Sequence, residues 1–392
     1  MSSTTSLILL LLNVMLFLRN RSELPRIDTV AKSLHPNASA VTRRWIGVQP
    51  IKDNKVIGGY GPWPVLCAGP QQTQPVRFCF KDDRSERNLQ PILDKAIAKW
   101  AHAMTVSTMA IVPDNADTLS CSDPKVRDDA LVIVDGTKDG NDEYNWNECS
   151  TESATTGYDY AGKQPGRHLL TFCHLIPRED STHDKAVKAM THELGHVMGL
   201  NHEHQRPDRD NYLTFHCENL DGYSKAVADV KIDEHALFDD DMNDDARVRV
   251  VCADDVAAGT YLPSALSFLR PQDVRSKAQR RKWKAYQNSQ KFDIDSIMIY
   301  DSFSGSPAGT NLDDHKKWVL TRKDGGAVVQ GGDVDAVKAK VSEGDVKAVA
   351  RLYPKPGVQE GLREWDVAMG RRLKVLIRGL EHVVDPPRKA SR

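Results

Sequence analysis

This chain of 392 residues lacks both an excess of charge of one sign and a long apolar run. It carries 53 Lys and Arg residues against 54 Asp and Glu residues, for a net charge of −1. This even balance gives no reason to expect a nucleic acid or an anionic membrane as a partner. The longest apolar stretch, residues 6–18, is interrupted by Asn13 and is shorter than the roughly 20 residues of a membrane-spanning helix. We therefore expect no nucleic-acid partner and no stable membrane span.

The apolar stretch has instead the length of the hydrophobic region of a signal peptide. No Lys or Arg precedes it, whereas Arg19 and Arg21 follow it, so a signal anchor is the alternative. We expect residues 1–22 to be a signal peptide and the chain to be secreted, with anchoring through residues 6–18 as the other possibility. Residues 23–60 contain three prolines and few large apolar side chains. They are predicted to be a pro-segment or an N-terminal arm.

The most informative motif runs from His192 to His202 and reads His-Glu-Leu-Gly-His-Val-Met-Gly-Leu-Asn-His. On a helix, His192 and His196 lie one turn apart on the same face. Gly199 permits the left-handed conformation that ends a helix, and the resulting turn brings His202 back as a third nitrogen ligand. Three histidines leave one position of a tetrahedral zinc site open, which is typical of a catalytic zinc site. Glu193 can reach a metal-bound water without binding the metal itself.

The sequence around this motif resembles the astacin family of zinc endopeptidases, within the metzincin clan. From His202 onward it reads His-Glu-His-Gln-Arg-Pro-Asp-Arg-Asp, which carries all six fixed residues of the astacin signature. Ser-Ile-Met-Ile-Tyr at residues 296–300 resembles the Met-turn, in which a methionine lies beneath the metal and a tyrosine two residues later faces it. Ile299 stands where the family usually has histidine, and Leu200 where it prefers phenylalanine. These two departures affect local packing more than chemistry.

The resemblance implies an α+β fold of the metzincin (zincin) type. Such a fold has a twisted, mostly parallel sheet with backing and active-site helices above the cleft. Its lower subdomain is mostly irregular and contains the Met-turn and a C-terminal helix. The resemblance also implies one Zn²⁺ per chain, held by His192, His196 and His202. Glu193 is then the general base and Tyr300 the group that binds the oxyanion, in an endopeptidase that cleaves peptide or protein substrates. The oligomeric state is left open.

Seven cysteines are present, at positions 67, 79, 121, 149, 173, 217 and 252, and none forms a Cys-x-x-Cys pair. In a secreted chain they would be mostly oxidised, with one left over. By resemblance to astacins, Cys149 and Cys173 form the disulfide that crosses the upper half of the cleft, while the family's second disulfide is missing. Cys217–Cys252 and Cys79–Cys121 are then expected as further bonds, with Cys67 unpaired.

Hydrophobic periodicity predicts secondary structure on both sides of the motif. Short runs rich in β-forming or apolar residues predict strands, and apolar residues three and four apart predict helices. The predicted strands are residues 76–80, 109–112, 130–134, 157–160 and 168–172, and the predicted helices are residues 89–104, 182–198 and 343–353. The strand at 157–160 is expected at an edge of the sheet, where metzincins bind a peptide substrate by extending the sheet.

We assign the astacin-like domain to residues 61–353, with an insertion at about 217–290 and a C-terminal tail of residues 354–392. Astacins are usually made as latent zymogens, but the pro-segment contains no clear latency element, so latency stays open. Two alternatives to a peptidase remain. One is a catalytically degenerate astacin-like domain that binds zinc or a partner, and the other is a zinc hydrolase for a different substrate. The presence of both Glu193 and Tyr300 argues against the degenerate domain.

Overall fold

The computed structural model describes residues 46–49, 51, 56, 59–66, 72–115, 117–137, 152–173, 180–232, 238, 242–274, 286–288, 292–311, 313–332 and 339–356. The chain divides into two compact units, Met1–Thr42 and Arg43–Arg392, and all described residues belong to the second. The predicted signal region, Cys67, Cys149 and the tail beyond residue 356 lie outside the described residues.

The described strands are β1 (Ile46–Val48), β2 (Tyr60–Gly61), β3 (Gln74–Phe80), β4 (Met109–Pro113), β5 (Leu131–Asp135), β6 (Ser153–Ala154), β7 (Tyr158–Asp159), β8 (His168–Phe172), β9 (Leu213–Phe215), β10 (Tyr286–Asn288) and β11 (Leu320–Arg322). The described α-helices are α3 (Asp83–Lys99), α4 (Ala101–Val106), α5 (Asp180–Val197), α6 (Tyr223–Ile232), α7 (Asp244–Val251), α8 (Asp255–Tyr261) and α10 (Glu343–Leu352). The described 3₁₀ helices are η3 (Glu203–Gln205), η4 (Arg209–Asn211), η5 (Cys217–Asn219), η6 (Pro263–Phe268), η7 (Pro271–Asp273), η8 (His315–Lys317) and η9 (Gln330–Gly332).

A five-stranded sheet in the order β4-β3-β5-β8-β6 forms the frame of the molecule. Its first four strands run parallel to one another, and β6 lies antiparallel to β8. Every residue of β3 is buried, as expected for a central strand covered on both faces. The α+β class with a mostly parallel sheet is therefore confirmed, as are the strands predicted at 76–80, 109–112, 130–134 and 168–172.

The strand predicted at residues 157–160 is not the edge of this sheet. Its residues form β7, which pairs with β2 outside the sheet, and β6 takes the edge position instead. The physical reason is Gly157, whose φ of 66° turns the chain away after β6. The Gly157 amide then donates to the carbonyl oxygen of His196 at 2.9 Å, which ties this turn to helix α5.

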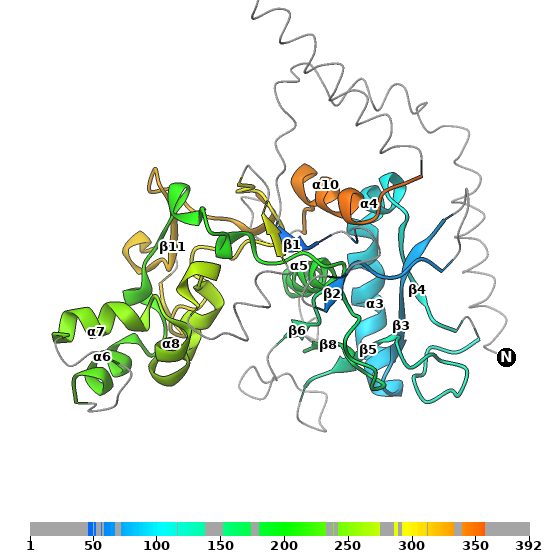
Figure 1. Cartoon of the computed structure of the whole chain (residues 1–392), viewed down its shortest axis with the longest axis horizontal. Coiled ribbons are helices and arrows are strands. Elements are labelled where there is room, and N and C mark those ends of the chain that lie inside the picture. The colour runs from blue at the N-terminus through cyan, green and yellow to red at the C-terminus, as the bar shows by residue number, and fades with distance from the viewer. Residues whose placement is uncertain are drawn as a thin grey trace, which may run out of the picture. The chain divides into compact units, whose positions relative to one another are not determined.

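Helices α3 and α5 pack against each other beside the sheet (Figure 1). Helix α3 begins after Asp82, whose side chain accepts a hydrogen bond from the Ser85 amide at 2.8 Å. The predicted apolar stripe of α3 is buried, but the helix ends at Lys99 and a separate helix, α4, follows Trp100. The predicted C-terminal helix is α10, which packs on α4. These helices and the sheet enclose the main hydrophobic core.

A second hydrophobic cluster is built by elements that follow the histidine motif. It includes β9, β11 and the short helices α6 to α8, which occupy much of the described part of the expected insertion (Figure 1). The disulfide Cys217–Cys252 joins η5 to the residue after α7, with an S–S distance of 1.97 Å. The disulfide Cys79–Cys121 joins β3 to the loop after β4. Both bonds were expected. Cys173 is also disulfide-bonded, and its expected partner Cys149 lies outside the described residues.

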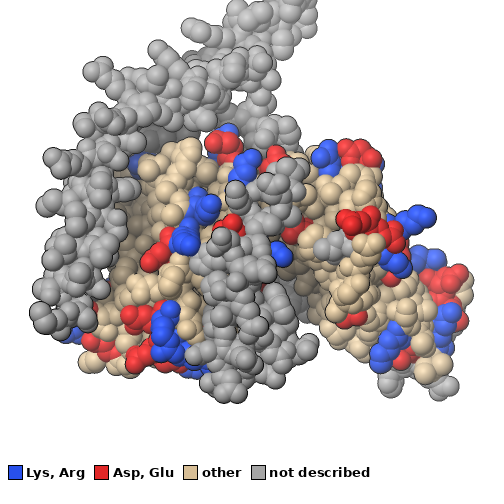
Figure 2. All heavy atoms as spheres, turned by 180° about the vertical axis from the view of Figure 1, so that it is seen from behind, with Lys and Arg blue, Asp and Glu red and all other residues tan. Residues whose placement is uncertain are grey.

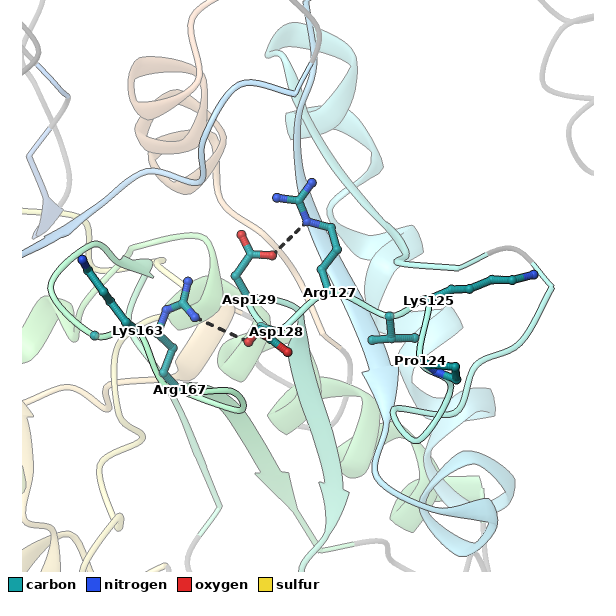
Figure 3. Close-up of a pocket in the computed structure, with 9 residues that line it drawn as sticks. Pro124, Lys125, Arg127, Asp128, Asp129, Lys163 and Arg167 are labelled. Carbon is teal, nitrogen blue, oxygen red and sulfur yellow. Dashed lines mark hydrogen bonds and ion pairs between the residues drawn. The ribbon is translucent and has the colours of Figure 1, made fainter.

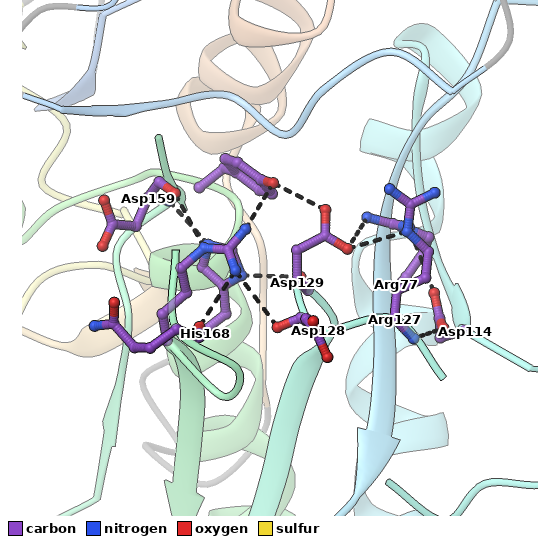
Figure 4. A network of polar contacts seen from close by, with 10 residues as sticks. Arg77, Asp114, Arg127, Asp128, Asp129, Asp159 and His168 are labelled. Atoms are coloured by element: carbon purple, nitrogen blue, oxygen red, sulfur yellow. Dashed lines mark hydrogen bonds and ion pairs between the residues drawn. The ribbon is translucent and has the colours of Figure 1, made fainter. Parts of the chain in front are cut away.

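A group of charged side chains, which we call the Arg77 network, links β3 to the segment just before β5 (Figure 4). Arg77 Nη2 lies 2.9 Å from Asp129 Oδ1, and Arg77 Nη1 lies 3.5 Å from Asp114 Oδ1. Asp129 also accepts hydrogen bonds from Arg127 Nε at 3.1 Å and from the Tyr158 hydroxyl at 2.8 Å. The carboxylate of Asp129 is therefore surrounded by donors.

Surface charge agrees with the even composition. On the face shown in Figure 2, acidic and basic side chains are interspersed, and neither sign forms a continuous patch on the described part of the chain. No helix among the described residues has the length and apolar character needed to cross a membrane.

Candidate functional site

Helix α5 carries the first half of the site and ends at Val197. Gly199 has a φ of 97°, and a Cβ at this position would lie 2.6 Å from Cγ2 of Val48. The Val48 amide donates to the carbonyl oxygen of Gly199 at 2.8 Å, and Trp63 Nε1 donates to that of Val197 at 2.9 Å. These donors satisfy carbonyl groups that the end of a helix leaves free. Residues from the N-terminal segment therefore fix the turn that brings His202 back toward His192 and His196.

The imidazole rings of the three motif histidines meet at their Nε2 atoms. Nε2 of His202 lies 3.1 Å from Nε2 of His192 and 3.0 Å from Nε2 of His196. Three nitrogens bound to zinc at its usual tetrahedral distances would lie about 3.3 Å apart, so the rings are already close to ligand positions. Among the described residues, these histidines form the one cluster of His, Cys, Asp or Glu side chains placed to hold a metal ion.

Oxygen acceptors fix the second nitrogen of each ring. Each Nδ1 atom faces an oxygen, at 2.8 Å for His192 and Ile297 O, 3.0 Å for His196 and Leu200 O, and 3.0 Å for His202 and Gln205 Oε1. Donation from Nδ1–H leaves the lone pair of each Nε2 free for a metal. Burial lowers the pKa of His192 to about 4, so this ring is neutral at neutral pH. With Nδ1–H donating in each ring, the three Nε2 lone pairs are available to a metal ion.

Residues 296–300, which resemble the Met-turn, lie against helix α5. A Cβ on Gly195 would lie 2.3 Å from Sδ of Met298, so the close approach of the methionine requires glycine at this position of α5. Asp345, in the first turn of α10, holds the segment from the other side. Its carboxylate accepts hydrogen bonds from Ser296 Oγ at 2.6 Å and from the Ile297 amide at 2.9 Å. Helix α10 therefore supports the Met-turn.

Tyr300 lies beside the histidines. Its ring centroid is 4.6 Å from that of His202 and 6.1 Å from that of His192. Burial, and secondly the charge of Glu193, raise the pKa of Tyr300 to about 12. The phenol therefore keeps its proton at neutral pH and can act as a hydrogen-bond donor.

Glu193 is buried next to the three histidines, and its Oε2 atom has no hydrogen-bond partner among the described residues. Burial, and secondly the negative charge of Glu152, raise the pKa of Glu193 to about 8. A buried carboxylate oxygen without a partner is rare and points to a missing one. A water molecule on a metal held by the three histidines would supply that partner, and the cation would lower the pKa again. The residues present therefore fit a catalytic zinc ion.

Comparisons with known proteins agree with this geometry. Residues 181–238 match the model of the peptidase family described as Astacin. Over 178 residues the chain is 28% identical to the astacin-like metalloprotease toxin 2 of Loxosceles intermedia, which covers 45% of this chain and 46% of the toxin. The chain is astacin-like.

Other relatives match shorter parts of this astacin-like chain. Over 73 residues it is 53% identical to the zinc metalloproteinase dpy-31 of Brugia malayi, which covers 18% of this chain and 11% of that protein. The chain thus spans less than half the length of the curated relatives described here. Among solved structures, high choriolytic enzyme 1, a hatching enzyme zinc-protease of Oryzias latipes, matches 78% of this chain and 98% of its own. Its sequence identity is 13% and its TM-score 0.41.

The astacin-like site also includes residues that the sequence did not predict. Gln205 orients His202, and its position three residues later in the chain is a signal that could have been used. Gln330 Nε2 lies 3.0 Å from the carbonyl oxygen of Ile297, the same oxygen that His192 faces. Gln330 follows the motif by more than a hundred residues and no local pattern marks it. Glu152 raises the pKa of Glu193 and was likewise missed.

The charged run after His202 folds into ion pairs rather than a solvated surface. Arg206 Nη1 lies 3.0 Å from Glu203 Oε1, and Arg206 Nη2 lies 2.8 Å from Asp208 Oδ2. Arg209 Nη1 donates to the carbonyl oxygen of Phe268 at 2.5 Å, which ties the run to the second hydrophobic cluster. These contacts hold the segment that follows the third histidine in the astacin-like fold.

A pocket of about 600 Å³ lies apart from the astacin-like site and contains none of its residues. It is lined by charged side chains before β5 and in the loop before β8 (Figure 3). Arg127 reaches Asp129, and Arg167 Nη1 donates to the backbone carbonyl of Asp128. Lys125 and Lys163 extend away from each other (Figure 3), so the cations of this pocket do not converge on one point.

Proposed function

We propose that this chain is a zinc-dependent endopeptidase. The observation that carries the proposal is the convergence of three Nε2 lone pairs beside Glu193, whose Oε2 has no partner among the described residues. This arrangement supports a metal held by His192, His196 and His202 with one position left for water. The astacin-like relatives named above include a metalloprotease toxin and a zinc metalloproteinase, which supports the same activity.

In this proposal His192, His196 and His202 would hold the zinc ion, which would supply an acidified water and polarise the scissile carbonyl. Glu193 accepts the proton of the attacking water and delivers it to the leaving amine. Tyr300 donates its phenolic hydrogen to the oxyanion that develops on the peptide carbonyl. Met298 takes no part in the chemistry and packs under the ligand helix.

The substrate is proposed to be an extended peptide that pairs with strand β6. This strand is the last of the five-stranded sheet, and among the described residues it pairs only with β8. A free strand edge offers backbone donors and acceptors to any peptide in an extended conformation. Strand β6 also lies against α5, which carries two of the histidines and Glu193.

The secreted location and the domain boundaries are also part of the proposal. Residues 1–22 are a signal peptide, residues 61–353 the peptidase domain with an insertion at about 217–290, and residues 354–392 a tail. For residues 23–60 we favour an N-terminal arm over a removable pro-segment, at least from Ile46 onward. Strand β1 pairs with β10, and the buried Val48 packs against Gly199. Disulfides such as Cys79–Cys121 are usual in oxidising compartments, which supports secretion.

Metal analysis combined with a peptidase assay tests the proposal. Wild-type protein is expected to contain one zinc per chain and to cleave casein, and a chelator is expected to stop the cleavage. His202→Ala should lose both metal and activity, whereas His102→Ala, which removes an exposed histidine on α4, should keep both. Glu193→Ala should keep the metal and lose the activity. Stoichiometric zinc without cleavage would favour the degenerate domain, and wild-type protein without metal would overturn the proposal.

A further inference from the structure

We propose that Glu152 determines specificity by binding a cationic group of the substrate, an ammonium or guanidinium, beside the scissile bond. The inference rests on the proposed peptidase function and names the class of substrate for the same site. It follows from where the backbone places Glu152, from the absence of a partner for its carboxylate among the described residues, and from its electrostatic contact with two groups of the site.

The backbone places Glu152 on the side of the sheet edge that faces the site. It directly precedes β6, in which Ser153 pairs with Thr171 and Ala154 with Leu170. Side chains two residues apart on a strand point to the same side, so Glu152 shares the orientation of Ala154. Ala154 packs against the main hydrophobic core, to which α5 belongs, and β6 lies against α5. A peptide added to this edge would therefore pass Glu152 close to the ligand helix.

The Glu152 carboxylate acts on both groups proposed to carry the chemistry. Its negative charge contributes to the raised pKa of Glu193 and to that of Tyr300. Coulomb interactions weaken with distance, which places Glu152 in the neighbourhood of both groups. Glu152 thus belongs to the same cluster as Glu193, although a different element carries it.

Glu152 is partly buried and has no hydrogen bond or ion pair with any described residue. Burial raises the pKa of its carboxyl to about 7. By contrast, Asp129 is paired with Arg77. A partly desolvated carboxylate without a partner costs stability, and a bound cation would reduce that cost.

This arrangement discriminates between substrates by charge. A cationic group beside the scissile bond would pair with Glu152, whereas a neutral group of the same size would leave the carboxylate desolvated and alone. An acidic group would add a third negative charge next to Glu193 and be rejected. The cation has two possible sources in a peptide: a Lys or Arg side chain, or the free α-amino group of the first residue.

Peptide pairs that differ in one charge test the inference. The substrates are fluorogenic peptides with lysine or norleucine next to the scissile bond, each with a free or an acetylated N-terminus. Wild-type protein is expected to cleave the cationic peptide with a kcat/KM at least about tenfold higher than its neutral partner. Glu152→Gln should reduce that ratio to about twofold or less, mainly through the cationic peptide. The matched control Glu218→Gln, at an exposed carboxylate on η5, should keep the wild-type ratio.

Two comparisons among these peptides identify the source of the cation. A preference for lysine over norleucine assigns the side chain, and a preference for the free over the acetylated N-terminus assigns the α-amino group. Wild-type ratios near one in both comparisons, or ratios that Glu152→Gln leaves unchanged, would overturn the inference while leaving the peptidase function in place.

Binding measurements separate this inference from the proposed function. Fluorescence anisotropy with the same peptides is measured on Glu193→Gln protein, with and without Glu152→Gln. If wild-type protein cleaves no peptide, the proposed function fails, and the binding ratio alone decides the role of Glu152. Tighter binding of the cationic peptide that is lost in the double variant supports the role, and equal binding of both peptides refutes it. Glu152→Gln replaces an unpaired carboxylate by a neutral amide, so we expect it to fold and to melt no lower than wild type.

Discussion

Two of the buried carboxylates in the described part of this molecule, Asp129 and Glu193, have opposite surroundings. In the Arg77 network, Asp129 is held by hydrogen bonds from Arg77, Arg127 and Tyr158. In the candidate site, Oε2 of Glu193 has no partner among the described residues. Burial alone would raise the pKa of Asp129, but the hydrogen bonds from Tyr158 and Arg127 and the charge of Arg77 outweigh it and lower the pKa to about 2. Burial raises that of Glu193 to about 8.

The difference separates a charge that stabilises the fold from one that the fold tolerates. A carboxylate whose pKa is lowered in the folded state stabilises that state at neutral pH. A carboxylate whose pKa is raised does the reverse, and strongly shifted groups of this kind cluster at functional sites. The same chemical change, carboxylate to amide, should therefore have opposite consequences in the two regions.

The largest expected effect comes from Glu193→Gln. The amide keeps the size of the side chain but cannot accept a proton, so kcat/KM for peptide cleavage should fall by about 10²- to 10⁴-fold. Zinc content and melting temperature should stay at or above those of wild type, because a desolvated charge has been removed. Stopped assays on peptide substrates, zinc analysis and thermal melts check this. A variant that keeps the wild-type kcat/KM would show that Glu193 is not the general base.

The matching change in the Arg77 network, Asp129→Asn, should act on stability instead. It leaves the buried Arg77 with Asp114, 3.5 Å from its Nη1 atom, as the remaining counter-ion, and the loss of the charged hydrogen bond to Asp129 should cost about 1–3 kcal/mol. Denaturant titration measures the loss, and kcat/KM per folded molecule should stay near the wild-type value.

The control for this change is Asp117→Asn, which removes an exposed partner of Lys125 at 3.9 Å and should change stability by less than about 0.5 kcal/mol. If Asp129→Asn costs no more than this control, the contrast between the two regions disappears.

A third change tests how the fold prepares the site. In Gly195→Ala the new Cβ would meet Sδ of the buried Met298. Alanine gains up to about 1 kcal/mol of helix propensity, but overpacking a buried contact costs about 1–3 kcal/mol. We expect a net loss of about 1 kcal/mol and weaker zinc binding, measured by denaturant titration and by competition with a zinc chelator.

Gly259→Ala is the matched control for that change. In α8 the nearest atom to a new Cβ is Cδ1 of Leu266 at 4.0 Å, so only the gain in helix propensity applies. This variant should be as stable as wild type or slightly more so. A similar gain in stability in Gly195→Ala would show that the Met298 side chain moves aside at little cost and does not support the three histidines.

Local patterns predicted more of the candidate site than of the arrangement around it. The spacing of His192, His196 and His202 determines their meeting point, because a helix and one glycine turn are enough to bring them together. Periodicity likewise predicted β8 with the bounds that the structure shows. Gln330 and Glu152 escaped prediction because their places depend on which loop packs against α5, and this tertiary information has no local signature.

The misplaced edge strand has the same origin. The residues of β7 alternate like those of an edge strand, but Gly157 and its hydrogen bond to His196 redirect the chain before they can join the sheet. Val48, near the N-terminal end of the described residues, is a second position that sequence patterns did not predict. The sequence places it in the N-terminal arm, yet it is fully buried against the turn that follows α5. Burial of this kind follows from the shape of the partner surface and not from hydrophobic periodicity.

The smallest expected effect is a difference in how stability depends on pH. In metal-free protein the pKa of Glu193 is raised to about 8 by burial, while an unfolded glutamate titrates near 4.3. Between these values the folded state binds more protons than the unfolded state, so this residue lowers stability as the pH rises from about 5 to 8. Asp129 contributes in the opposite sense, since its lowered pKa gives stability that is lost only as the pH falls below about 4 toward 2.

Thermal melts of metal-free protein at pH 5 and pH 8 measure this difference. The fall in melting temperature between the two should be a few degrees larger for wild type than for Glu193→Gln, and the other titrating groups cancel in that comparison. With zinc bound, the cation lowers the pKa of Glu193 and the two proteins should converge. Parallel melting curves in the metal-free state would mean that water or another group already satisfies Glu193. The raised pKa would then not show that Glu193 lacks a partner until a metal-bound water is present, and its contrast with Asp129 would lose its functional meaning.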